Sequence, residues 1–212
     1  MTHWKTLVGR WGSNAGETDD VRIDGSTNSL QTIEYEHHEI HSGSSFTCWH
    51  SETAPTDIND RTVIGFLTPS GTKYIHVTAS ASATAISVAR IREGPDYTAD
   101  SGTTLPIYNR NRVGSPSTSI VLDISQNPDT ANSATYWEHD DANLPSENGT
   151  ILADIPLGSA TSPVKSVGGS ARAQQEWILK ASTFYTFEVK SLDASDNTHW
   201  LEIDWYEHTD KH

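Results

Sequence analysis

Three residues near the start of the chain have the types and spacing of metal ligands. His37, Glu39 and His41 alternate along the sequence. If this segment is a strand, alternate side chains share one face, so the three could face one divalent cation such as zinc. A neighbouring strand could supply a fourth ligand, for which His76 and His199 are candidates. The alternative, which we favour, is a strand whose histidines lie at a sheet edge or subunit interface and bind no metal.

The last well-patterned segment of the sequence carries two carboxylates that could act as an acid–base pair. Glu202 and Asp204 alternate with apolar residues, which predicts a strand with one buried and one wet face. A half-exposed antiparallel strand needs polar residues on its wet face, so we interpret both carboxylates as solvated. Trp200 and Tyr206 fall on the same face and could stack against a sugar ring. The residues predicted to close the core are Leu201, Ile203 and Trp205.

Three other groups of residues are weaker candidates for catalysis or metal binding. Cys48 and His50 could form a nucleophilic pair, but a buried free thiol is the better interpretation. Residues 57–60 suggest calcium ligands, yet they miss the EF-hand spacing and fit a turn better. Residues 138–141 cluster acid and imidazole in what we expect to be a solvated loop. Phosphate-loop, nucleophile-elbow and dinucleotide motifs are absent from the sequence. Their absence does not exclude a glycosidase, whose two carboxylates need not be close in sequence, but it argues against an enzyme, and we expect no catalysis and no cofactor.

Composition and charge restrict the classes of partner. The chain has 212 residues and a net charge of −14, which opposes binding to nucleic acid or to anionic membranes. A single cysteine excludes an intrachain disulfide. Hydrophobic residues make up only 34% of the chain, which fits short strands joined by polar turns better than long helices.

The elements that would position these residues are strands. Alternating patterns predict about a dozen short strands separated by turn signals, and hence an all-β, antiparallel β-sandwich for which a jelly roll is a natural arrangement. The runs 62–67 and 73–79 flank a Pro-containing turn and predict a hairpin. The Ser/Ala run 79–85 is expected to be an edge loop, and residues 125–172 a long inserted loop. An Asn-Gly turn is predicted at Asn148.

The first residues differ from the rest of the chain. Trp4, Leu7, Val8 and Trp11 have helical spacing and are followed by a Gly/Ser and acidic stretch. Two tryptophans this close together favour docking over exposure to solvent. We therefore predict a short N-terminal arm over residues 1–30 that contacts a partner, and a β-sandwich domain over residues 31–212.

Two segments carry a resemblance to a known group of proteins. Residues 33–43 and 201–209 resemble segments of tailed-phage virion structural proteins of the capsid decoration, or cement, type, and Asn109-Arg110-Asn111-Arg112 is similar to a motif in that group. The resemblance extends from about residue 30 onward. It implies a β-rich, non-enzymatic protein on the outer surface of the phage head, with the major capsid protein as its partner.

The sequence therefore predicts a head-stabilising virion protein that clamps adjacent major capsid subunits. Such proteins gain affinity by avidity, which favours self-association as a homotrimer at three-fold positions. The first alternative is a carbohydrate- or receptor-binding module of a tail or fibre, with Trp200 and Tyr206 as its platform. The second is a metal-dependent hydrolase built on His37, Glu39 and His41.

Overall fold

A computed structural model describes residues 35–53, 55–113, 117–126, 129–157, 166–167 and 176–209. The predicted arm residues Trp4, Leu7, Val8 and Trp11 lie outside these described residues. The chain divides into two units, 1–38 and 39–212, and the described strands all belong to the second. Among the described residues, no helix is long and apolar enough to cross a membrane.

The described elements are one short helix and a series of strands. In chain order they are α1 (Tyr35–Ser42), β1 (Ser45–Glu52), β2 (Arg61–Leu67), β3 (Lys73–Ala83), β4 (Ser87–Glu93), β5 (Thr103–Pro106), β6 (Tyr108–Asn109), β7 (Leu122–Asp123), β8 (Thr130–Ala131), β9 (Ser133–Trp137), β10 (Thr150–Leu157), β11 (Ser166–Val167), β12 (Trp177–Leu179), β13 (Phe184–Ser191) and β14 (His199–Thr209).

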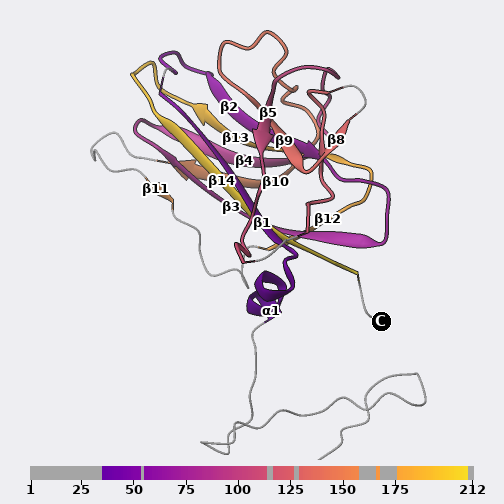
Figure 1. The fold of residues 1–212 in the computed structure, drawn as a ribbon. Helices are drawn as coiled ribbons and strands as arrows, with labels where there is room; N and C mark the ends of the chain where they lie inside the picture. Colours follow the sequence, from indigo (N-terminus) through magenta and orange to yellow (C-terminus); the bar gives the residue numbers. More distant parts are fainter. Residues whose placement is uncertain are drawn as a thin grey trace, which may run out of the picture. The chain divides into compact units, whose positions relative to one another are not determined.

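The described strands form two antiparallel sheets that pack face to face (Figure 1). The six-stranded sheet has the order β11-β3-β14-β1-β6, with β12 also paired to β3. The eight-stranded sheet has the order β10-β4-β13-β2-β7-β8, and β9 joins β2 to β5. From β1 to β4, and again from β12 to β14, each successive strand lies in the opposite sheet from the strand before it. The orders β12-β3-β14-β1 and β10-β4-β13-β2 are those of a jelly roll, so the predicted fold class is confirmed.

The inner faces of both sheets form the main core. Leu201, Ile203 and Trp205 are buried as predicted, and the Trp205 ring lies 5.8 Å from Phe46 and 5.7 Å from Phe66. Burying a side chain of this size stabilises the fold by about 1.5–3 kcal/mol. Strand β14 pairs with β3 over its whole length and with β1 along most of it, which makes it a central element of the scaffold.

The strand predicted around His37, Glu39 and His41 is wrong, because this segment is helix α1. Gly43 has a φ of 77°, the Gly43 amide bonds the Ile40 carbonyl at 3.1 Å, and the Ser44 amide bonds the Glu39 carbonyl at 3.0 Å. These two bonds are the Schellman motif that ends helices at glycine. A helix turns about 200° over two residues, so it does not gather alternate residues on one face.

The predicted hairpin is also wrong, since β2 and β3 belong to different sheets. The turn between them crosses from one sheet to the other and is held by Thr68, whose hydroxyl donates to the Lys180 carbonyl at 2.6 Å. The Ser/Ala run is not a loop but the second half of β3. Within β3, the alanines of this run point into the core and the serines point outward. The strict alternation of Ala and Ser is the period-two pattern of a strand.

The segment 125–172 is not one long loop, because it contains β8, β9, β10 and β11. Strand β10 forms an edge of the eight-stranded sheet beside β4. The predicted Asn-Gly turn precedes it: Gly149 has a φ of 82°, and a Cβ there would lie 2.6 Å from the Glu93 carbonyl oxygen. Both observations require glycine at this position.

Candidate functional site

A buried chain of hydrogen bonds fills one end of the space between the sheets. Thr62 on β2 donates to the Glu52 carboxylate, and its hydroxyl oxygen lies 2.8 Å from His199 Nδ1. Ser191 Oγ lies 3.0 Å from His199 Nε2 and accepts from Asn197 Nδ2 at 3.0 Å. Because the Thr62 hydrogen points to Glu52, Nδ1 of the neutral ring donates and Nε2 accepts.

These hydrogen-bonded residues include the types found in a catalytic triad, but a substrate could not reach them. Burial lowers the pKa of His199 to about 4, so the ring is neutral at physiological pH. Ser191 and His199 are both 0% exposed, so no substrate reaches the serine oxygen. A nucleophile must meet its substrate as well as its base, and the cluster therefore serves to satisfy polar groups between the sheets.

Glu52 also binds a second histidine, His139, through the ring Nδ1. Burial lowers the pKa of His139, but the hydrogen bond and negative charge of Glu52 outweigh burial and raise it overall. The neighbouring Glu138 lies 3.5 Å from His50, which stacks on Tyr136 at 4.0 Å. Glu138 and His139, half of the acid–imidazole cluster at 138–141, are thus anchored to β1. The prediction that this loop is solvated is therefore only partly correct.

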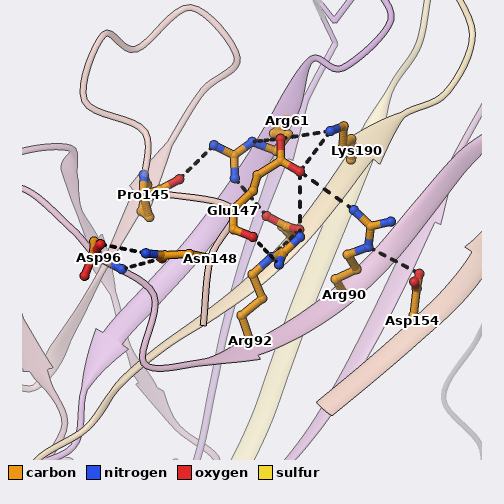
Figure 2. A network of polar contacts seen from close by, with 10 residues as sticks. Arg61, Arg90, Arg92, Asp96, Pro145, Glu147, Asn148, Asp154 and Lys190 are labelled. Carbon is orange, nitrogen blue, oxygen red and sulfur yellow. Dashed lines mark hydrogen bonds and ion pairs between the residues drawn. The ribbon is translucent and has the colours of Figure 1, made fainter. Parts of the chain in front are cut away.

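A network of ion pairs lies on the outer face of the eight-stranded sheet (Figure 2). At its centre Glu188 is 1% exposed and accepts from Arg61 at 3.0 Å and from Arg92 at 2.9 Å. The same arginines donate to the Pro145 carbonyl at 2.7 Å and the Glu147 carbonyl at 2.6 Å. The arginines therefore neutralise a buried carboxylate and fasten the 138–149 loop to the sheet.

The rim of this network is more exposed. The Glu147 carboxylate accepts from Lys190 at 2.8 Å and lies 3.8 Å from Arg90, which also pairs with Asp154 at 3.3 Å (Figure 2). Burial raises the pKa of Glu147, but the surrounding cations outweigh burial and lower it overall. Asn148 holds the loop through two hydrogen bonds to Asp96. All these contacts are internal, so we assign the network a structural role.

A second, smaller core lies beside the network on the same face. Val63, Ile124, Trp137 and Phe184 are buried there. Gly65 lies beneath them: a Cβ at this position would lie 2.8 Å from the Phe184 ring and 3.1 Å from Trp137. We call this outer surface of the eight-stranded sheet, with the small core and the Glu188 network, the covered face.

The outer surface of the six-stranded sheet has a different character. We call it the open face; its residues are Thr47, Trp49, Thr78, Ser80, Tyr108, Trp200, Glu202 and Asp204. Trp49 is 52% exposed and Tyr108 is 47% exposed, while Trp200 is partly buried. Glu202 pairs with Trp49 on one side and with Ser80 on the other. No described residue donates a hydrogen bond to the side-chain carboxylate of Glu202 or of Asp204.

Beyond Asp204, the same sheet surface is filled by stacked rings. Tyr206 is only 6% exposed, so the expectation that it forms an exposed platform is wrong. His76 stacks on Tyr206 at 4.6 Å and contacts His208 Nε2 at 2.7 Å. Glu176 accepts from the Tyr206 hydroxyl at 2.6 Å and closes the cluster.

The structure describes the side chains of two of the three candidate metal ligands on helix α1. Glu39 is buried and His41 is exposed, while the His37 side chain lies outside the described residues. His76 pairs with Tyr206 and His199 with Ala83, which separates them by roughly 23 Å along the strands. Within the described ranges, no group of three His, Cys, Asp or Glu side chains could hold a metal ion.

The remaining sequence candidates have structural roles. Cys48 is fully buried, and burial together with Asp204 and Glu202 raises the pKa of its thiol, as expected for an inert thiol. Asp60 accepts from the backbone amides of Thr56 and Asp57 at 3.0 and 2.9 Å. The loop at 57–60 is therefore the capped turn that we predicted.

An open groove of about 450 Å³ lies between residues 69–73 and 118–122. The ionisable residue behind its wall, Glu207, turns inward: it accepts from Ser119 Oγ at 2.6 Å, from the Ile120 amide at 3.0 Å and from Trp205 Nε1 at 3.1 Å. Burial raises the pKa of Glu207 despite these bonds. The groove thus receives no catalytic group from Glu207.

Comparison with known proteins adds no family to this description: no protein-family model, curated protein or solved structure matches the chain.

Proposed function

We propose that this protein is a non-enzymatic structural component of a tailed-phage virion. It binds the outer surface of the head, as a homotrimer, and stabilises contacts between major capsid subunits. The sequence resemblance at residues 33–43 and 201–209 suggests this role, and jelly rolls are a common fold of viral capsid domains.

The observation that carries the proposal is that the buried ionisable residues are hydrogen-bonded to other parts of the same chain. Glu52, Glu188, His199 and Glu207 are each bonded to other residues of the chain, and none of them lies free in an open groove. Polar groups committed in this way rigidify a fold and specify one core. A rigid and acidic domain suits a protein that must hold neighbouring capsid subunits in a fixed arrangement.

Virion composition and capsid stability test the proposal. We expect mass spectrometry and a cryo-EM reconstruction of purified virions to show the protein on the head. Adding the purified protein to heads that lack it should raise the temperature at which those heads break. Trp4→Ala/Trp11→Ala should weaken head binding, and Trp49→Ala should leave it unchanged. Virions that carry no copy on the head would disprove the proposal.

A further inference from the structure

The open face holds three aromatic side chains in a line. Trp49 pairs with Glu202, Ser51 pairs with Trp200, and Thr47 pairs with Tyr108. Trp49 is therefore the diagonal neighbour of Trp200 on one side and of Tyr108 on the other. Diagonal neighbours lie about 7–8 Å apart, so the three rings cross β14, β1 and β6 over roughly 15 Å.

Hydrogen-bond acceptors and hydroxyls lie beside these rings. Glu202 and Asp204 stand on β14, which lies between β1 and β3, and Thr78 and Ser80 oppose them from β3. Burial and the charge of Asp204 raise the pKa of Glu202 and outweigh the positive charge of Arg110, which lowers it. Both carboxylates lack hydrogen-bond donors among the described residues, whereas Glu52, Glu188 and Glu207 each have them. Their unused acceptor capacity faces outward.

The charge of the open face excludes several classes of occupant. Nucleic acids and other polyanions would be repelled by Glu202 and Asp204. A second copy docked through the same surface about a two-fold axis would bring four carboxylates together, since such an interface pairs identical patches. The centre of a protein–protein interface is depleted of charged residues, yet here the central strand carries two.

A ligand that suits this surface offers apolar C–H faces to the rings and O–H donors to the carboxylates. Sugar rings offer both, and an extended polymer can follow a line of aromatic residues across a flat sheet. We propose that the open face binds a neutral polysaccharide, stacked on Trp49 with Trp200 and Tyr108 and hydrogen-bonded to Glu202 and Asp204. This inference does not depend on the proposed capsid role, because it concerns the isolated protein.

An array of neutral glucans, mannans, galactans and xylans tests the inference, with hyaluronan and polyuridylate as anionic comparisons. We expect the full-length protein to bind at least one neutral polymer and neither anionic one. Titration of the best binder should then blue-shift the tryptophan fluorescence as water leaves the Trp49 ring.

Variants identify the surface. Trp49→Ala should weaken binding about tenfold or more, as for truncation of a central aromatic contact, and Glu202→Gln with Asp204→Asn should weaken it several-fold. Tyr74→Ala is the matched control, because this exposed tyrosine lies on the same sheet but outside the line of three aromatic residues. The Tyr74→Ala variant should bind the polysaccharide with the affinity of the wild type. Equal losses in Trp49→Ala and Tyr74→Ala would contradict the assignment.

Three further outcomes would overturn the inference. The first is a protein that binds no neutral polymer of the array. The second is a change of oligomeric state in Trp49→Ala by analytical ultracentrifugation, which would make the open face a contact between copies. The third is loss of head binding in Trp49→Ala, which would make it the capsid contact and leave the proposed virion role intact.

Discussion

On the covered face, loops pack over the sheet and the arginines around Glu188 hold them in place. On the open face, the aromatic residue Trp49 remains half exposed, and the carboxylates of Glu202 and Asp204 receive no hydrogen bond from the part of the chain that the structure describes. Both surfaces belong to sheets of the same sandwich and both contain tryptophan and acidic side chains. The difference shows that residue type alone does not distinguish a scaffold from a binding surface: what distinguishes them is whether the hydrogen-bonding and packing capacity is already used.

The sharpest way to break this comparison is to remove one tryptophan from each face. Trp137→Ala should lower the free energy of unfolding by about 3–5 kcal/mol, because the ring is fully buried in the small core. Trp49→Ala should change it by about 0.5 kcal/mol or less, as for exposed sites. Urea denaturation followed by circular dichroism measures both, and similar losses would show that the open face is packed.

The second test concerns the carboxylates. Glu188→Ala should cost about 3–5 kcal/mol of stability, because it removes the nearest and most buried counter-ion of Arg61 and Arg92. The more exposed Glu147 carboxylate, at 3.6 and 3.7 Å, remains as their longer-range partner. The control is Asp154→Ala, which removes an exposed partner of Arg90 and should cost no more than about 1 kcal/mol. If Glu188→Ala were as mild as its control in urea denaturation, the loop would not depend on the network.

The third test concerns the interior that both faces share. His199 has a folded pKa of about 4 and an unfolded pKa near 6.5, so below about pH 6.5 the unfolded chain takes up a proton that the folded chain refuses. Acidification from about pH 6.5 to 4 should therefore remove about 3 kcal/mol of stability through this residue. The raised pKa of His139 acts in the opposite direction.

Stability measured across this pH range in His199→Gln isolates the contribution. The variant should lose less stability on acidification than the wild type. An unchanged pH profile in His199→Gln would show that the ring takes up its proton as readily in the folded chain as in the unfolded chain, which would contradict the lowered pKa.

Local patterns in the sequence predicted much of this structure. Alternation at Leu201, Ile203 and Trp205 predicted a buried strand face because side-chain direction in a strand depends on local geometry alone. The same rule failed at His37, Glu39 and His41, where alternation of histidine and glutamate carries no apolar signal. Gly43 and the histidine of the last turn were the available signs of a helix end.

The parts that sequence could not predict depend on long-range pairing. Arg61, Arg92 and Glu188 meet only because β13 lies between β2 and β4, and a period of two does not specify partners. Sequence reasoning offers strand tryptophans such as Trp49 for a sugar-binding platform but favours the core or an interface for most of them, because the line that Trp49 forms with Trp200 and Tyr108 exists only across three strands. Gly65 was a usable clue, since glycine inside a strand pattern often marks close packing.

The central position of β14 has a consequence for biosynthesis. Strands β1 and β3 leave the ribosome early, but the edge that each of them turns toward β14 stays unpaired until β14 is made. Ser45 and Trp205, which bond across that junction, are separated by 160 positions. Contacts of such separation fold slowly, and until then β1 and β3 present unpaired edges that invite aggregation. We therefore expect the yield of this domain to depend on translation speed and on chaperone access.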